Sequence, residues 1–192
     1  MRQQLINGFG QDNGHLTIDG IDVVPLAKKY GTPLIVISEN MIRNNINSLV
    51  NAISSNFRAY EIKYAVKANP NPSILSIAKE QGLGIDASSR NEATLALRTG
   101  FKAEKIMFTP NFASREELLW ASNSGMAVNF DSVSQLAQVS GKVPKTVSFR
   151  IKINYGKGEF KGTTTSGHNA KFGILESDSI DAYFFLLSVL LV

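Results

Sequence analysis

Cysteine is absent from the 192 residues of this chain. Its absence excludes disulfide bonds, thiolate metal sites and cysteine nucleophiles together. The two histidines show no metal-ligand spacing with other residues, so no metal site is predicted. A chain without cysteine also fits a cytoplasmic location, where disulfide bonds are rare.

Excess charge of one sign and long apolar runs are missing as well. The chain has 20 Lys and Arg against 16 Asp and Glu, and its net charge is +4. The basic residues are interleaved with acids, so no nucleic-acid-binding face is predicted. Residues 1–14 lack the apolar run of a signal peptide. The apolar run 182–192 is shorter than the about 20 residues that cross a bilayer. We therefore expect no nucleic-acid or membrane partner.

Apolar, β-rich runs recur along the sequence and predict strands. Their starts lie roughly 20–28 residues apart, which is the length of one strand-helix unit. The predicted strands are Leu34–Ile37, Ile62–Val66, Leu83–Ile85, Ile106–Phe108, Met126–Phe130 and Val147–Ile151. Before them, Leu16–Ile18 predicts a short strand and Pro25–Tyr30 a short helix.

Helix signals of one kind lie between the predicted strands. Three serines are each followed three residues later by Glu or Gln, which is the capping-box pattern. Each box leads into apolar residues and then a glycine suited to the left-handed conformation that ends a helix. The boxes start at Ser89, Ser114 and Ser132, the glycines are Gly100, Gly125 and Gly141, and a further helix is predicted from Pro72 to Gly82.

Alternating strands and helices imply a parallel sheet, either doubly wound or closed as a (β/α)8 barrel. Polar residues follow several strands at the same place. Because polar residues at successive strand ends describe a barrel mouth, we predict an α/β fold with a partial TIM barrel of about six of the eight strands. The strand-end residues are Lys67, Asn69, Asp86, Ser88, Asn111, Asp131 and Arg150.

Lys67 is the candidate for covalent chemistry. It directly follows the apolar segment Tyr64–Val66. A buried lysine is costly unless it is paired, neutral or covalently used. Desolvation favours the neutral amine, which is the form that attacks a carbonyl carbon. Position alone nevertheless favours a plain lysine whose ammonium group reaches water at the rim of the sheet.

Several ordered motifs resemble one enzyme family. Tyr64-Ala-Val-Lys-Ala-Asn69 resembles the Y-A-[VS]-K-A-N segment of the pyridoxal-phosphate (PLP) decarboxylases of the alanine-racemase-like barrel class. Gly84–Ser89 with Glu92 resembles their G-x-D-x-A-S-x-x-E junction. Arg150-Ile151, Thr165–His168 and Lys171–Ile174 resemble R-[IV]-N-P followed by T-G-x-x-x-S-K-F-G. The resemblance extends from Gly14 to Ile174 and is nearest to the diaminopimelate decarboxylases.

The resemblance implies a cofactor and a set of site residues. Lys67, held out of water, would bind PLP covalently, and His168 would lie against the pyridine ring. Asp86, Glu92 and Arg150 would form the polar floor around lysine and cofactor, which is compatible with ion pairing between strands. The implied reaction is decarboxylation of a small amino acid. The first candidate is the conversion of meso-diaminopimelate to lysine. Decarboxylases of ornithine, carboxynorspermidine or carrier-bound amino acids stay open as alternatives.

The resemblance also implies three segments. Residues 1–33 normally join a β-domain that the sequence lacks, residues 34–183 form the incomplete barrel, and residues 184–192 form an apolar tail where the family has a charged, amphipathic helix. The family's glycine-rich phosphate turn and its E-P-G-R segment are missing. We therefore expect a truncated form, inactive alone, whose tail arose by frameshift or gene truncation. The full-length form would be a homodimer.

Other classes of protein remain open at this point. A single-domain PLP-binding homeostasis protein shares the barrel and the lysine, but it lacks the lead-in Gly14–Pro33 seen here. Alanine racemase is disfavoured by the K-F-G and D-x-A-S segments. A non-functional gene remnant is the third alternative.

Overall fold

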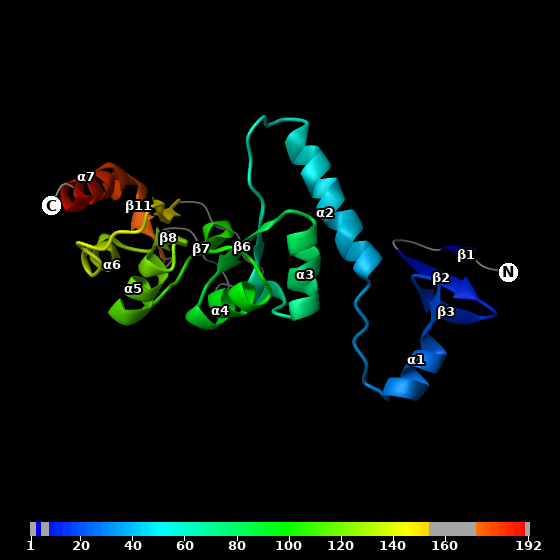
Figure 1. Ribbon diagram of the computed structural model, residues 1–192. Coiled ribbons are helices and arrows are strands. Elements are labelled where there is room, and N and C mark those ends of the chain that lie inside the picture. The colour runs from blue at the N-terminus through cyan, green and yellow to red at the C-terminus, as the bar shows by residue number, and fades with distance from the viewer. Residues whose placement is uncertain (1–2, 5–7, 154–171, 191–192) are drawn as a thin grey trace. The chain divides into compact units, whose positions relative to one another are not determined.

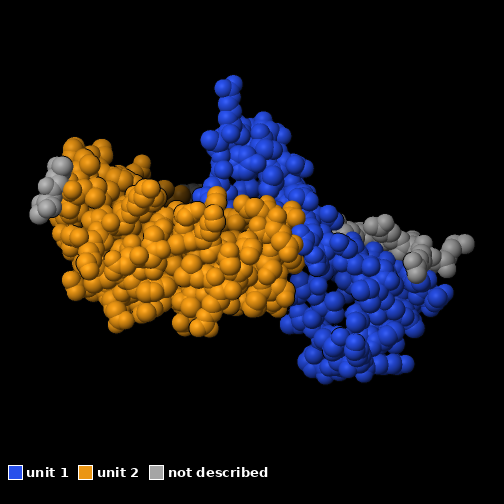
Figure 2. Space-filling model, viewed as in Figure 1, with its two compact units in different colours: residues 1–62 blue, residues 63–192 orange. Residues whose placement is uncertain are grey.

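The computed structural model describes residues 3–4, 8–153 and 172–190. It divides into two compact units, residues 1–62 and residues 63–192, which are blue and orange in Figure 2. The division falls within the predicted second strand, between Ile62 and Lys63. His168 and Lys171 lie outside the described residues.

The first unit begins with a four-stranded antiparallel sheet in the order β1-β2-β3-β4. Two tight hairpins build it, because Asn13-Gly14 and Asp19-Gly20 all have positive φ, as a two-residue type I′ turn requires. The predicted strand Leu16–Ile18 is confirmed within β3. The strands are β1 (Gln3–Gln4), β2 (Phe9–Asp12), β3 (His15–Ile18) and β4 (Ile21–Asp22).

Two helices complete the first unit. The Asp22 carboxylate caps α1 (Val23–Tyr30) by accepting from the Val24 amide at 2.8 Å. The Ser38 hydroxyl caps α2 (Glu39–Ser54) by accepting from the Met41 amide at 2.9 Å. Between the helices, the predicted strand Leu34–Ile37 is wrong, since no strand is present there. An apolar run becomes a strand only when its backbone pairs, and Ile35 is instead 88% exposed.

The second unit is built on a five-stranded parallel sheet in the order β5-β6-β7-β8-β9. Five of the six predicted strands are therefore confirmed, in chain order. Just beyond β9, β10 (Ile151–Lys152) pairs in parallel with β11 (Ile174–Leu175). The five strands are β5 (Lys63–Ala65), β6 (Gly84–Ala87), β7 (Ile106–Phe108), β8 (Ala127–Phe130) and β9 (Val147–Phe149).

Helices connect these strands and pack against the sheet (Figure 1). The predicted glycines that end them all have positive φ, at Gly82, Gly100, Gly125 and Gly141. Short 3-10 turns lie at Val66–Ala68, Ala103–Lys105 and Glu176–Asp178. The helices are α3 (Pro72–Glu80), α4 (Arg90–Arg98), α5 (Arg115–Asn123), α6 (Val133–Ala137) and α7 (Ser179–Leu190).

The predicted capping boxes are complete at only one helix. At α5, the Ser114 hydroxyl accepts from the Glu117 amide at 3.2 Å, and the Glu117 carboxylate accepts from the Ser114 amide at 3.0 Å. At α4 and α6, Ser89 and Ser132 cap the helix as predicted. The side chains of Glu92 and Gln135, however, accept from the amide of the residue before the cap, which is Ser88 at α4 and Asp131 at α6. Those two side chains therefore tie the preceding strand end to the helix.

Removing the α5 cap should lower stability. Ser114→Ala is expected to cost about 1 kcal/mol in the free energy of unfolding, measured by urea denaturation. Ser73→Ala is the control, because Ser73 is an exposed residue in the first turn of α3 and Asn71 is the cap there. Equal losses in the two variants would contradict the cap.

The same cap should make stability depend on pH. Hydrogen bonds from the Ser114 amide and hydroxyl hold the pKa of Glu117 below its ordinary value. Because the folded pKa is lowered, the stabilisation is present above the unfolded pKa and is lost as pH falls through the folded one. The stability difference between the unaltered chain and Ser114→Ala should therefore shrink in acid.

The core of the second unit lies between its sheet and helices, and aromatic contacts link its layers. Phe130 of β8 is 0% exposed, and its ring centroid lies 6.2 Å from that of Phe149 in β9. Phe149 meets Tyr183 of α7 edge to face at 5.2 Å. The remaining fully buried large side chains are Phe108, Leu75, Ile85, Ile106, Leu118, Met126, Leu136, Val66, Val128 and Val139.

Helix α7 carries apolar side chains on two faces. Ala182 and Leu186 are buried, while a second set with helical spacing is exposed. No helix in the part of the chain that the structure describes has both the length and the apolar character to cross a membrane. The exposed set comprises Ile180, Tyr183, Phe184, Leu187 and Leu190.

Candidate active site

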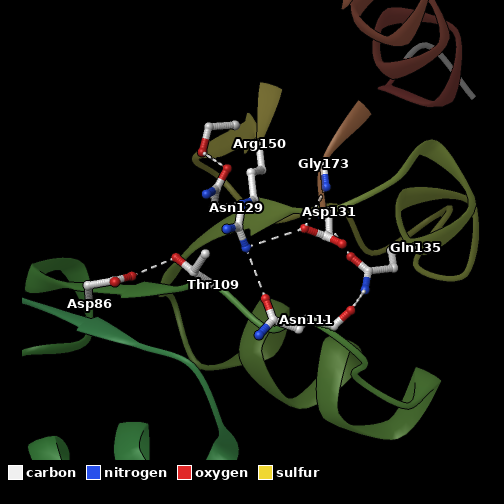
Figure 3. A network of polar contacts seen from close by, with 9 residues as sticks. Asp86, Thr109, Asn111, Asn129, Asp131, Gln135, Arg150 and Gly173 are labelled. Carbon is white, nitrogen blue, oxygen red and sulfur yellow. Dashed lines mark hydrogen bonds and ion pairs between the residues drawn. The ribbon is translucent and has the colours of Figure 1, made fainter. Parts of the chain in front are cut away.

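Polar side chains gather where the parallel strands end (Figure 3). Asp86 lies at the end of β6, Asn111 and Asp131 follow β7 and β8, and Arg150 follows β9. In parallel sheets of α/β proteins, the carboxyl ends of the strands are where ligands bind. The structure therefore brings the predicted strand-end residues of β6 to β9 to one edge of the sheet.

Arg150 is held from several directions. Its Nη1 donates to Asn111 Oδ1 at 3.0 Å and lies 3.7 Å from Asp131 Oδ1. Its guanidinium carbon lies 4.6 Å from the centre of the Phe172 ring. A guanidinium group stacks on aromatic faces as well as donating in its own plane. Arg150 is thus a fixed cation at the strand ends.

Asp131 is fixed in turn. Its Oδ1 accepts from the Gly173 amide at 3.0 Å, and its own amide donates to Gln135 Oε1 at 2.9 Å. Burial raises the pKa of Asp131, against the opposing effects of the Gly173 hydrogen bond and of the Arg150 and Lys152 charges. Asp131 therefore ties together β8, α6 and the residue before β11.

Asp86 belongs to a separate contact. Thr109 Oγ1 donates to Asp86 Oδ1 at 2.7 Å, and the Thr109 amide donates to the Ala87 carbonyl at 2.8 Å. Figure 3 shows this pair beside the Arg150 contacts, not joined to them. Asp86 and Arg150, which the sequence predicts to share one floor, thus lie in two sets of polar contacts.

Lys67 lies in the 3-10 turn Val66–Ala68, directly after β5. The hydroxyl of Tyr64 donates to the Asn69 carbonyl at 3.1 Å, so one hydrogen bond spans the turn that carries the lysine. Burial raises the pKa of Tyr64. The expectation that Lys67 is held out of water is wrong here, because its side chain is exposed. Among the described strands β5 pairs only with β6, so Lys67 follows an edge strand.

Glu92 serves the junction between β6 and α4. Its Oε2 accepts from the Ser88 amide at 2.7 Å, which fixes the backbone just after Asp86.

A hollow of about 590 Å³ lies where the loops after β7 and β8 meet. Its lining is rich in hydroxyl and amide groups and includes Asn111, Ser114, Asp131, Ser132, Ser134, Gln135 and Gly173.

These residues fit a pyridoxal cofactor. The cofactor needs a primary amine for covalent attachment, and Lys67 presents one that is exposed. Its charged groups need fixed partners, and the Arg150 cation and the half-buried Asp86 carboxylate, each fixed by its own contacts, would suit that need. In the described part of the chain, no cluster of His, Asp and Glu could hold a metal ion.

The sequence does not indicate the roles of three residues that shape this edge of the sheet. Thr109 holds Asp86, Gln135 holds Asp131, and Phe172 stacks on Arg150. Thr109 directly follows the predicted strand Ile106–Phe108, so the strand-end pattern could have found it. Nothing in the sequence indicates the stacking of Phe172.

The parallel sheet, with a lysine after β5 and polar residues along its carboxyl edge, defines an α/β enzyme domain of the TIM-barrel type. Residues 43–187 match the family model of the pyridoxal-dependent decarboxylases, pyridoxal binding domain. The chain therefore belongs to the pyridoxal-dependent decarboxylase family. The predicted family and its cofactor, PLP, are confirmed.

Named relatives and solved structures agree with this family. Diaminopimelate decarboxylase from Methanothermobacter thermautotrophicus is 41% identical over 174 residues, 90% of this chain and 41% of the relative. That from Thermoplasma acidophilum is 38% identical over 172 residues, 90% of this chain and 42% of the relative. The crystal structure of the M. jannaschii diaminopimelate decarboxylase is 29% identical, with a TM-score of 0.82, and the match covers 94% of this chain and 44% of that chain.

The match to solved decarboxylases confirms the predicted α/β fold with a partial barrel. The chain spans about two fifths of the length of the curated relatives it matches, since the shares are 41% and 42%.

Proposed function

We propose that this chain is the PLP-binding part of an amino-acid decarboxylase that converts meso-diaminopimelate to lysine. The observation that carries the proposal is the 41% identity to a diaminopimelate decarboxylase over 90% of the chain. A second support is the M. jannaschii diaminopimelate decarboxylase solved in complex with L-lysine, which matches with a TM-score of 0.81. The proposed setting is cytoplasmic.

Each site residue receives a proposed role. Lys67 carries the cofactor covalently, and the turn that holds it is fixed by the bond between Tyr64 and Asn69. Asp86 and Arg150 provide fixed charges beside the cofactor, while Glu92 holds the backbone that follows Asp86. His168, which lies outside the described residues, is proposed to contact the pyridine ring.

The chemistry is divided between cofactor and protein. When bound, PLP withdraws electrons from the α-carbon of an amino acid, so that carbon dioxide can leave. The protein binds and orients the substrate and excludes water from it. Lys67 must present its neutral amine to react, and in the exposed turn after β5 a cofactor aldehyde has direct access to that amine.

The proposal extends to the state of the chain. We propose that these 192 residues bind PLP but do not decarboxylate alone, and that the complete protein is a homodimer. The edge strand β5, which leaves Lys67 exposed to water, supports the first part of this proposal. The resemblance to the family supports the second.

Two experiments test the function. The chain is first incubated with PLP and reduced with borohydride, and the adduct is mapped by peptide mass. It should lie on Lys67, and an adduct on Lys63 or Lys79 instead would contradict the proposal. Residues 14–183 of this chain then replace the matching segment of the full-length M. thermautotrophicus relative. That chimera should release carbon dioxide from meso-diaminopimelate, whereas release from ornithine alone would overturn the proposed substrate.

A further inference from the structure

We propose that Asp131 is a positioning residue, which acts on the cofactor site only through Arg150. The two side chains, from the ends of β8 and β9, would work as one unit that sets where the cation stands. This inference rests on the proposed function, because it takes Arg150 to belong to the cofactor site.

The contacts of Arg150 leave its guanidinium little freedom. Asn111 accepts from Nη1 at 3.0 Å and fixes one direction within the guanidinium plane. Phe172, at 4.6 Å from the guanidinium carbon, covers one face of that plane. Asp131 adds an opposite charge at 3.7 Å from the same Nη1. The amide of Asn111 is neutral and the ring is uncharged, so Asp131 is the partner that balances the positive charge.

Asp131 is placed for this task by the backbone around it. The Gly173 amide donates to Oδ1, the same oxygen that faces Arg150. Gln135 accepts from the Asp131 amide and, through Nε2, donates to the Asn111 carbonyl at 3.4 Å. The two residues that contact Arg150 Nη1 are therefore linked to each other through Gln135. A shift of one would be transmitted to the other.

Burial makes the pairing matter. The Asp131 side chain is 11% exposed and the Arg150 side chain 28% exposed. Removing one partner from a largely buried pair leaves the other charge uncompensated, which costs more than the loss of an exposed pair. Because Arg150 is the more exposed of the two, it should turn toward water when Asp131 loses its charge.

A double-mutant cycle separates positioning from direct contact, since Asp131 also lines the hollow beside the site. The variants are Asp131→Asn, Arg150→Gln and the two combined. Asn keeps the shape and the acceptor for Gly173. The control Asp181→Asn removes the same charge from an exposed position on α7. The readout is the PLP concentration that gives half-maximal borohydride trapping on Lys67, together with the absorption maximum of the bound cofactor.

The expected pattern is non-additive. Asp131→Asn should weaken PLP binding about tenfold and shift the absorption maximum, within the range of coupling between contacting residues. In the Arg150→Gln background it should add less than about twofold. Asp181→Asn should change neither readout. Additive losses, or no loss on Arg150→Gln, would overturn the inference while trapping on Lys67 still supports the proposed function.

A second variant guards against misfolding. If circular dichroism shows that Asp131→Asn does not fold, the cycle is run with Asp131→Glu, whose extra methylene displaces the carboxylate but keeps the charge. This variant should weaken binding roughly threefold beside Arg150 and leave it unchanged beside Arg150→Gln. Equal weakening in both backgrounds would overturn the inference. Absence of trapping in the unaltered chain would overturn the proposed function, and the inference with it.

Discussion

Lys67→Arg should abolish covalent attachment of PLP to this chain. Arginine keeps the positive charge and the length of the side chain, but its guanidinium stays protonated and does not act as an amine nucleophile. The measurement is borohydride trapping followed by peptide mass, with the visible absorption of the bound cofactor as a second readout. We expect trapped cofactor to fall to the background of free lysines.

Lys142→Arg is the matched control for this prediction. Lys142 is an exposed lysine in the turn before β9, so its replacement makes the same chemical change away from the site and should leave trapping unaltered. Both variants should unfold at the same urea concentration as the unaltered chain, because both side chains are exposed. Trapping that survives Lys67→Arg in full would refute the covalent role of Lys67.

Phe130→Ala should lower the free energy of unfolding far more than Ser114→Ala does. Phe130 is 0% exposed, lies on an interior strand of the sheet and contacts Phe149. Truncating a buried phenylalanine removes transfer free energy and leaves a cavity, so the expected cost is about 3–5 kcal/mol in the free energy of unfolding. Chemical denaturation followed by circular dichroism measures this cost. A cost of that size approaches the whole stability of a small domain.

Phe184→Ala removes the same atoms from a residue that is 65% exposed. Surface substitutions usually change stability by less than about 0.5 kcal/mol, so the control should unfold with the unaltered chain. Comparable losses for the two phenylalanines would mean that the core between sheet and helices is not packed as described.

Much of the second unit could be predicted from the sequence, because local signals and tertiary structure agree there. Apolar runs gave the strands, and serine caps with terminal glycines gave the helices. The predicted strand Leu34–Ile37 was wrong because an apolar run indicates that a segment is buried or paired, but it does not show which segment it pairs with. Helix α2 was not predicted, although Ser38 followed by Glu39 is a helix-start signal.

The site was predicted by position but not by contact. Strand ends indicated Asp86 and Arg150, yet which side chains pair depends on the register of neighbouring strands. Ala87 lies opposite Phe108, which puts Thr109 next to Asp86. Sequence gives no register of this kind between strands about 20 residues apart. The exposure of Lys67 also follows from which strands surround β5, and that is a tertiary property.

Helix α7 has a further consequence for how this protein behaves in a test tube. Its solvent-exposed face, which includes Phe184 and Leu187, is apolar like the face that is buried. A dye whose fluorescence increases in nonpolar surroundings should bind to this helix and fluoresce, and the protein should self-associate as its concentration rises. The double variant Phe184→Lys, Leu187→Lys should lower the dye fluorescence and sediment as a monomer, with its buried core unchanged.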